Sequence, residues 1–357
     1  MALTDFWFAA IAALWTGYFF LEGFDFGVGI LLRLLGRNDT ERRVLLNTIG
    51  PVWDGNETWL IVAGGATFAA FPEWYAAMFS SLYLPLLAIL VALIVRGVAF
   101  EFRGKEDSAR WRRNWDRAVC YGSLVPAVLW GVAFANLVRG VPLAAGGVYA
   151  GSVLDLVNPY ALVGGLATLA LFVFHGAVFV ALKTTGQVRV RARAVASRVG
   201  PVALVAGGGL LAWTQVRHGG VDTAVTALLT AAALVGALAA NRAGREGYAF
   251  GFTGAAVALA TVTLFLALYP NVMPSTLDPA GTLTVTNAAS GHYTLVVMTW
   301  VAVVFLPLVM LYQGWTYWVF RRRIGTEHIP APADQADHAE PERAPVAVSS
   351  GVGGPPR

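Results

Sequence analysis

The sequence has few of the residues that bind metals or form covalent cross-links. It contains one cysteine, Cys120, and five histidines among its 357 residues. A single cysteine cannot form an intrachain disulfide, and the sequence has no Cys-x-x-Cys-His haem-attachment motif and no clustered Cys/His metal spacing. It also lacks a Walker motif and a glycine-rich dinucleotide fingerprint. These absences argue against a chain that holds a nucleotide, a metal or a covalent haem by itself.

Charge is scarce as well, and apolar residues take its place. Charged residues make up 13% of the chain and hydrophobic residues 57%, with a mean hydropathy of +0.62. Apolar stretches of about twenty residues recur, each long enough to cross a hydrocarbon core about 30 Å thick. The sequence therefore predicts an all-α polytopic membrane protein with about nine transmembrane helices. The expected spans are residues 6–32, 51–72, 74–101, 117–138, 158–182, 197–216, 221–240, 247–269 and 292–320.

The basic residues indicate the orientation of these spans. The net charge of +4 could suggest nucleic acid, but most of the 25 Lys and Arg residues cluster in alternate loops, after the first, third, fifth, seventh and ninth spans. The opposite loops hold only Arg139 and Arg217. Because Lys and Arg are enriched in cytoplasmic loops, we expect an outside N-terminus and a cytoplasmic C-terminus. The acidic Asp5 and the long first apolar run favour a retained helix over a cleaved signal.

Two segments differ from the apolar spans. Residues 327–357 are rich in Pro, Ala, Asp, Glu and Ser and cannot bury enough apolar surface to offset their ordering entropy. We therefore predict a transmembrane domain over residues 1–326 and a disordered cytoplasmic tail over residues 327–357. In residues 101–117, Trp111 and Trp115 are four apart among arginines, which is the pattern of a short interfacial helix.

Two carboxylates inside the first apolar run are the most informative residues. Glu22 and Asp25 are three apart, so they lie on one face of a helix. Ionisable groups at membrane depth cost several kcal/mol unless they are paired or hydrated, so they indicate a proton path, an ion site or an interface. The alternative is that Asp25 lies near the cytoplasmic end of the helix and reaches water.

A second polar group begins the second span. Asp54 or Asn56 could cap that helix, and Glu57 would favour its positive end. Two carboxylates together with Trp53 and Trp59 are more than a cap requires. The acids are therefore further proton-path candidates, and the two tryptophans are candidates for packing or an interface.

Arg96 and His175 complete the set of candidates. Arg96 follows a run of apolar residues and could pair with one of the acids or extend to the cytoplasmic surface. His175 is the one histidine placed clearly at membrane depth, whereas an intramembrane haem needs one or two axial ligands there. A lone helix histidine is more often a packing or interface residue, so we predict no haem and no metal on this chain.

Three blocks of the sequence are distinctive: residues 23–29 (GFDFGVG), 35–43 (LGRNDTERR) and 53–60 (WDGNETWL). They resemble blocks of subunit II of the cytochrome bd quinol oxidases, including the related cyanide-insensitive branch. Further blocks are residues 64–66, 96–103, 131–133, 156–160 and 298–304. They occur in the family's order between about residues 5 and 323.

The resemblance implies a multi-pass subunit in the bacterial plasma (inner) membrane. It implies a partner, subunit I, that holds haem b and haem d, oxidises quinol and reduces dioxygen to water. Subunit II would share the fold of subunit I, carry no haem and not be catalytic alone. Family acids that match Asp25 and Asp54 are implicated in proton uptake from the cytoplasm, near an arginine that matches Arg96. Small accessory membrane subunits and a bound structural quinone or lipid are further expectations, whereas nucleic acid is not.

Two other functions fit the same residues. In an ion-coupled transporter, Glu22, Asp25 and Asp54 would bind the coupling ion, although the sequence shows no internal repeat of the kind that many transporters have. In a purely structural scaffold, the buried acids would only pair with Arg96. Purification separates the first alternative, because an oxidase subunit brings haem absorbance with a larger partner and a transporter does not.

Overall fold

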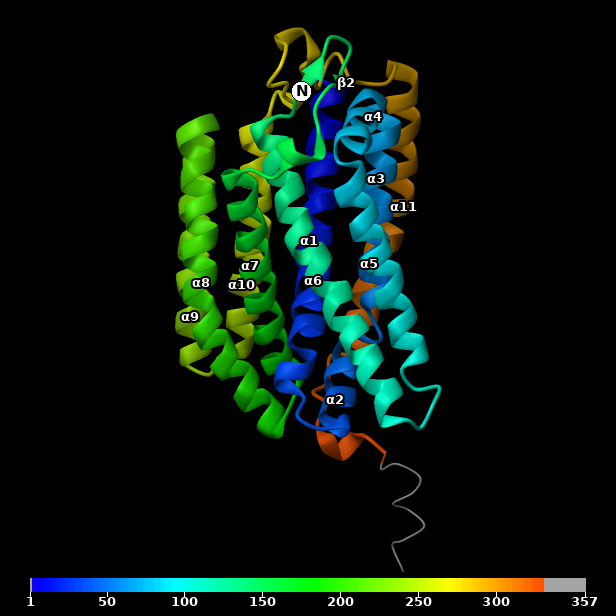
Figure 1. The fold of residues 1–357 in the computed structure, drawn as a ribbon, viewed down its shortest axis with the longest axis vertical. Coiled ribbons are helices and arrows are strands. Elements are labelled where there is room, and N and C mark those ends of the chain that lie inside the picture. The colour runs from blue at the N-terminus through cyan, green and yellow to red at the C-terminus, as the bar shows by residue number, and fades with distance from the viewer. Residues whose placement is uncertain (1, 331–357) are drawn as a thin grey trace, which may run out of the picture.

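The computed structural model describes residues 2–330, which form a bundle of long helices with small hairpins at one end (Figure 1). The eleven α-helices are α1 (Leu3–Leu35), α2 (Asp39–Ile49), α3 (Trp53–Ala70), α4 (Pro72–Ser81), α5 (Tyr83–Phe102), α6 (Ala109–Arg139), α7 (Pro159–Lys183), α8 (Gly186–His218), α9 (Val221–Arg242), α10 (Glu246–Leu268) and α11 (His292–Val319). The predicted tail begins within the 3-10 helix η3 (Thr326–His328), and residues 331–357 lie outside the described part of the chain.

The helical membrane fold is confirmed. Among the described residues, the seven helices α5 to α11 are long and apolar enough to cross a membrane. α1 runs through the middle of the same bundle (Figure 1), but it carries two acidic residues in its interior. The number of about nine spans therefore remains a prediction, as does the orientation.

Several elements differ from the predicted ones. The predicted third span, residues 74–101, is broken at Leu82 into α4 and α5, and α4 begins with Pro72 at its first turn. Trp111 and Trp115 do share one face, with ring centroids 5.5 Å apart, but they belong to the first turns of α6 and not to a separate interfacial helix. The polar helix α2 was not predicted, because it has no apolar run.

α1 is the central helix and packs against α3, α6, α7 and α10. Its second half is almost completely buried, and two glycines allow its close approach to α7. A Cβ atom at Gly27 would lie 2.8 Å from the Cα atom of Gly176, closer than real Cβ contacts. Small residues at such crossings let helix backbones approach closely in membranes. The crossing holds the acidic part of α1 inside the bundle.

Ion pairs hold α2 against the ends of the long helices. Asp116 of α6 accepts hydrogen bonds from Arg42 at 3.1 Å and from Arg103 at 2.6 Å. Glu41 pairs with Arg191 of α8 at 2.7 Å. Burial alone would raise the pKa of Glu41, but hydrogen bonds from Arg191 and from the backbone N–H of Arg37 lower it below its ordinary value. Ion pairs therefore add to the buried apolar face of α2, which includes Val44, Leu45 and Ile49.

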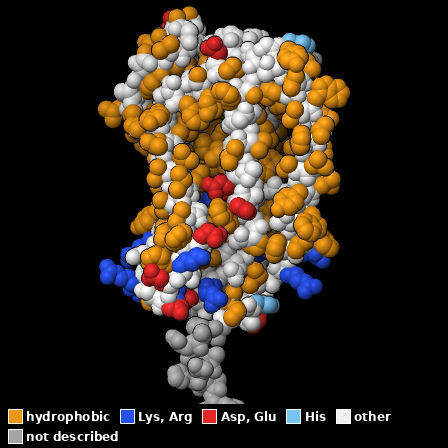
Figure 2. Space-filling view, turned by 90° about the vertical axis from the view of Figure 1, so that its right-hand side faces the viewer, with side chains coloured by type: hydrophobic (Ala, Val, Ile, Leu, Met, Phe, Trp, Pro, Cys, Tyr) orange, Lys and Arg blue, Asp and Glu red, His pale blue; other side chains and the backbone are white. Residues whose placement is uncertain are grey.

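The opposite end carries two antiparallel hairpins, β1 (Leu143–Ala144) with β2 (Val148–Tyr149) and β3 (Asn271–Met273) with β4 (Leu283–Thr284). In one hairpin Leu143 lies opposite Tyr149, and in the other Asn271 lies opposite Thr284. The Lys and Arg side chains seen in Figure 2 gather at the end away from these hairpins. This is the end that the charge pattern assigns to the cytoplasm.

The helix α11 is the least enclosed of the long apolar helices. Leu295 is its one buried residue, although the helix has 28 residues. It touches α3 and α1 along one side, and its other side exposes large apolar residues such as Trp300 and Leu311. The face formed by α3, α5 and α11 is shown in Figure 2, where acidic side chains lie in a hollow between columns of hydrophobic ones.

Candidate functional site

Glu22 of α1 forms a buried ion pair with Arg96 of α5. The two guanidinium nitrogens donate to the two carboxylate oxygens at 2.6 and 3.2 Å, and both side chains are 0% exposed. A bidentate pair of this kind combines charge with the fixed planar geometry of the guanidinium. Of the two alternatives for Arg96, the structure shows pairing and contradicts an extension to the surface.

The surroundings of Arg96 are otherwise apolar. Its guanidinium carbon lies 4.8 Å from the ring centre of Phe26 and 5.7 Å from that of Phe100, in cation–π arrangements. Gly122 of α6 leaves room for the arginine, because a Cβ atom there would lie 2.8 Å from the Cβ of Arg96. The charge of Arg96 is thus neutralised by Glu22 within a low-dielectric site.

Asp25 has a different partner. Its Oδ2 accepts a hydrogen bond from the side-chain amide of Asn56 of α3 at 2.7 Å, and the residue is 0% exposed. Its other oxygen, Oδ1, is buried and has no hydrogen-bond partner among residues 2–330. The alternative that Asp25 simply reaches water at the end of its helix is therefore wrong for this chain. Spacing placed both acids on one helix face, but packing directs them to different neighbours.

Asn56 connects Asp25 to the last helix. Its Oδ1 accepts hydrogen bonds from the hydroxyl of Tyr317 at 2.7 Å and from the amide of Gln313 at 3.0 Å. The indole N–H of Trp59 donates to the Oε1 of Gln313 at 2.7 Å. Five side chains from α1, α3 and α11 are therefore hydrogen-bonded to one another. Trp59 is the first donor, Tyr317 is a second donor to Asn56, and the bonds end on Asp25.

The other acids of the second polar group lie nearer the surface. Asp54 is exposed, and its carboxylate accepts the neighbouring backbone N–H of Gly55 at 2.7 Å. Glu57 is half-buried. Neither Asp54 nor Asn56 caps α3, since the N-cap position is Val52 and makes no side-chain cap bond. The predicted capping role is wrong, because the chain enters α3 two residues earlier than that role requires.

The two candidate aromatic residues have distinct contacts. Trp53 packs on Phe100 of α5 with ring centroids 4.9 Å apart. Trp59 is held by its hydrogen bond to Gln313 and lies over Gly17 of α1, where a Cβ atom would collide with the indole ring. Both tryptophans thus pack between helices near the buried acids Glu22 and Asp25, which are called the acid cluster below. Trp53 lies against α5, and Trp59 lies against α11.

His175 is buried in α7, away from these acids. Its Nε2 lies 3.2 Å from the carbonyl oxygen of Phe20, so Nε2 carries the proton, and its Nδ1 accepts from the hydroxyl of Thr253 at 2.7 Å. The ring stacks on Phe250 with centroids 4.8 Å apart. Both nitrogens are used within the chain, so the residue does not fit an axial haem ligand.

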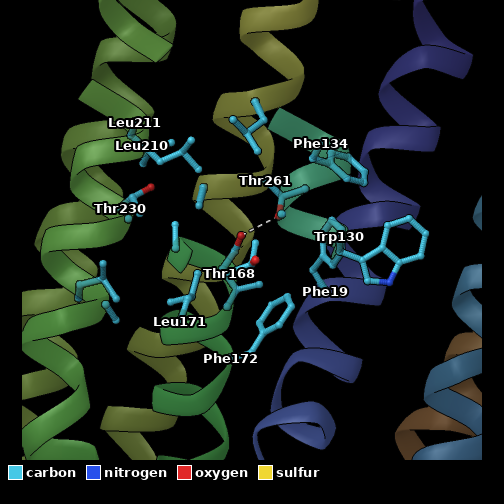
Figure 3. Close-up of a pocket in the computed structure, with 18 residues that line it drawn as sticks. Phe19, Trp130, Phe134, Thr168, Leu171, Phe172, Leu210, Leu211, Thr230 and Thr261 are labelled. Atoms are coloured by element: carbon cyan, nitrogen blue, oxygen red, sulfur yellow. Dashed lines mark hydrogen bonds between the residues drawn. The ribbon is translucent and has the colours of Figure 1, made fainter. Parts of the chain in front are cut away.

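One enclosed cavity lies among α1, α6, α7, α8, α9 and α10 (Figure 3). Its volume is about 50 Å³. Its lining is mostly aliphatic and aromatic, with Phe19 and Trp130 among the labelled residues in Figure 3. The hydroxyls of three threonines in the lining, Thr168, Thr230 and Thr261, donate to backbone carbonyls. Cavities of this character stay dry unless they contain several polar partners. No part of the acid cluster borders this cavity.

Sequence reasoning missed three polar residues near the acid cluster. Asn56 was considered only as a helix cap, whereas Gln313 and Tyr317 were not singled out. A signal was present, because Gln313 interrupts a long apolar run, and polar side chains in such runs commonly bond across helices. The residues that fasten α2, Glu41 and Asp116, were missed because they lie outside the apolar spans.

These features define a class of protein. The chain is a multi-helix membrane protein with a buried Arg–Glu pair, a separate buried carboxylate and no group of three or more His, Cys, Asp or Glu residues among the described positions that could hold a metal. Buried ionisable residues of this kind are typical of a proton path, an ion site or an interface in a membrane protein.

Comparison with known proteins gives the family. The family described as cytochrome bd terminal oxidase subunit II matches residues 3–320, and the chain belongs to this family. It is 45% identical over 332 residues to cytochrome bd ubiquinol oxidase subunit 2 of Bacillus subtilis (strain 168), covering 90% of this chain and 97% of that one. It is 37% identical over 361 residues to cytochrome bd-I ubiquinol oxidase subunit 2 of Escherichia coli (strain K12), covering 90% and 95%.

A solved structure has the same fold. A chain of the bd oxidase from Geobacillus thermodenitrificans matches with a TM-score of 0.73 at 19% identity, covering 90% of this chain and 99% of that one. The chain is therefore subunit II of an oxidoreductase complex, a multi-pass protein of the bacterial inner membrane, and this role implies a subunit I partner.

Proposed function

We propose that this chain packs on a haem-bearing subunit I of a quinol:oxygen oxidoreductase and supplies it with cytoplasmic protons through Asp25. The observation that supports this role is the environment of Asp25, which is buried, lacks a basic partner within hydrogen-bond distance and has one unbonded oxygen. A carboxyl group in this state can accept and release a proton without breaking an ion pair. Glu22 cannot do so, because protonation would leave Arg96 as an unpaired buried charge.

The acids of α3 extend the proposed route toward the cytoplasm. Asp54 is exposed, Glu57 is half-buried, and the two are three residues apart on one face of the helix. Asn56, between them in sequence, contacts Asp25 directly. Protons would therefore pass from Asp54 and Glu57 at the helix start toward Asp25 inside the bundle. Glu22 and Arg96 would fix the position of α1 beside this route.

The face made by α3, α5 and α11 is the proposed docking surface for subunit I. Lipid cannot satisfy the carboxylates that lie in the hollow of this face (Figure 2), because hydrocarbon offers no hydrogen-bond donors. α11 has one buried residue, which also fits a helix whose exposed side is covered by a partner. A protein partner over the hollow would keep the route out of contact with lipid and deliver protons to the site of oxygen reduction.

The redox groups belong, in this proposal, to the partner. Haem b and haem d would lie in subunit I, where quinol is oxidised, because His175 has no free nitrogen for a haem iron. Small accessory membrane subunits remain an expectation from the family resemblance. Neither the ion-coupled transporter nor the pure scaffold explains why Asp25 is kept apart from Arg96.

A bound lipid fits one surface of the chain better than its interior. The enclosed cavity of about 50 Å³ is smaller than the sites that hold small molecules, so a quinone headgroup would have to displace its walls. An open groove of about 530 Å³ between α5 and α6 is lined by Leu87, Val91, Val95 and other apolar residues. We therefore place a bound lipid chain in this groove rather than a structural quinone in the cavity.

Asp25→Asn in the assembled complex tests the proton role. The amide keeps the shape of the carboxylate but cannot carry a proton. We expect normal haem content and a loss of quinol oxidation of about a hundred-fold or more, in the range of a lost acid–base group. Asp222→Asn, at an exposed acid of α9 away from the cluster, should leave both unchanged. Normal turnover of Asp25→Asn would overturn the proposed function.

A further inference from the structure

We propose that Asn56 is a positioning residue that, held by α11, fixes one oxygen of Asp25 as a permanent acceptor and leaves the other to exchange the proton. This inference rests on the proposed proton role of Asp25. It concerns the direction of hydrogen bonds along the chain from Trp59 through Gln313 and Asn56 to Asp25. It also makes the orientation of the Asp25 carboxyl group depend on the position of α11.

The direction of these bonds follows from the first donor. The indole nitrogen of Trp59 can only donate, so the atom of Gln313 that faces it, 2.7 Å away, must be the carbonyl oxygen Oε1. The amide nitrogen of Gln313 then faces Asn56 and donates to it at 3.0 Å. The orientation of the glutamine amide, which could be reversed in isolation, is thus determined by its neighbour.

Two donors determine the orientation of Asn56 in the same way. The nitrogen of Gln313 and the hydroxyl of Tyr317 both point at one atom of Asn56, which must be its oxygen. Its amide nitrogen is then directed at Asp25 Oδ2 at 2.7 Å. A reversed Asn56 amide would place an oxygen against the carboxylate and its N–H groups against the Gln313 amide. In a buried site such unmade bonds cost more than they do in water.

The consequence for Asp25 is an asymmetric carboxyl group. Oδ2 already accepts a hydrogen bond from an N–H group that can only donate, and a proton on Oδ2 would weaken that bond, so Oδ2 is the poorer site for the proton. Oδ1 is buried and has no partner among the described residues. The proton therefore binds at Oδ1, and the hydrogen bond from Asn56 keeps that oxygen in one direction through each cycle of uptake and release.

The anchor of this arrangement is on the helix that the rest of the chain holds least. Tyr317 and Gln313 are half-buried on the inner side of α11, and most of the remaining helix is exposed. A displacement of α11 would separate both donors from Asn56 and free its amide to rotate. Contacts that hold α11 in place therefore determine the orientation of the Asp25 carboxyl group. In the proposed complex, subunit I docked on this face supplies such contacts.

Asn56→Leu in the assembled complex is the first test. It keeps the volume of the side chain but removes the donor to Asp25 and the acceptor for α11. We expect kcat for quinol oxidation to fall by about ten-fold or more, as for a lost hydrogen bond to a charged group. The KM for quinol and the haem content should be unchanged. Introduced into Asp25→Asn, the same substitution should cause no further loss, because the two residues act as one unit.

A second variant leaves Asn56 in place. Tyr317→Phe combined with Gln313→Leu removes both donors to the amide oxygen, and we expect the same fall in kcat as for Asn56→Leu. It provides the test if Asn56→Leu fails to assemble. The matched control is Tyr248→Phe, which removes the hydroxyl of an exposed tyrosine of α10 and should change nothing.

Three outcomes would overturn the inference. The first is normal turnover in Asn56→Leu, and the second is normal turnover in the double variant of Tyr317 and Gln313. The third is a fall in kcat caused by Asn56→Leu that is as large in the Asp25→Asn complex as in the native complex. The last result would mean that Asn56 acts independently of Asp25. Normal turnover in Asp25→Asn alone would instead overturn the proposed function. If Asp25→Asn is impaired and the Asn56 and α11 variants are not, only the inference fails.

Discussion

The buried pair of Glu22 and Arg96 gives the sharpest prediction on assembly. Glu22→Gln removes one charge and leaves the guanidinium of Arg96 uncompensated among Phe26, Phe100 and the helix backbones. Arg96→Gln removes the other charge and leaves a buried carboxylate. The double substitution Glu22→Gln with Arg96→Gln removes both charges and leaves no unpaired buried charge.

The magnitude follows from the burial of both partners. Two charges about 4 Å apart attract by about 4 kcal/mol at an effective dielectric constant of 20. Removing one member of a buried pair costs roughly 3 to 5 kcal/mol, several times the roughly 1 kcal/mol of a single neutral hydrogen bond. Replacing both members is often close to neutral. We therefore expect two severe single variants, a mild double variant and a coupling energy of roughly 6 kcal/mol or more, because two losses of roughly 3 kcal/mol or more each are nearly absent from the double variant.

The measurement is the yield and thermal inactivation half-life of the purified complex. A half-life is appropriate because large membrane complexes commonly unfold irreversibly. Each single variant should lower the assembled yield and shorten the half-life, and the double variant should restore most of both. If the losses of the two single variants simply add in the double variant, the pairing does not stabilise the complex as described. If Arg96→Gln instead restores the assembly of Asp25→Asn, the charge of Arg96 is balanced by Asp25 and not by Glu22.

Two further predictions concern Glu41 and His175. The pKa of Glu41 is lowered in the folded chain, so its stabilisation is present above the ordinary glutamate value and is lost as pH falls through the lowered value. Lowering the pH from 7 to about 4 should shorten the inactivation half-life less in Glu41→Gln than in the native complex, whereas the exposed Glu106→Gln should behave as native. The chain expressed without subunit I should show no Soret band, and His175→Ala should retain the full haem content of the complex. Selective loss of one haem would contradict the packing role of His175.

Local sequence patterns were sufficient for the class of fold. The apolar runs predicted helices within a membrane because a span of hydrocarbon requires about twenty apolar residues, whatever the neighbouring helices are. The same patterns could not locate the break at Leu82 between α4 and α5, since the residues on both sides are apolar. They also could not show α2, because its ion pairs join residues far apart in the sequence: Arg42 with Asp116, Asp39 with Arg103 and Glu41 with Arg191.

For the site, likewise, the sequence was sufficient to identify some of the residues, whereas the tertiary structure determined their partners. The cost of burying charge singled out Glu22, Asp25 and Arg96 from the sequence alone. A helix spacing of three places the two acids on one face but does not say which neighbour each one meets. That depended on packing, because α5 brings Arg96 to Glu22 whereas α3 and α11 bring Asn56 and Tyr317 to Asp25. Asn56 and Tyr317 are 261 residues apart, and a hydrogen bond over that separation exists only when the helices between them have folded around α1.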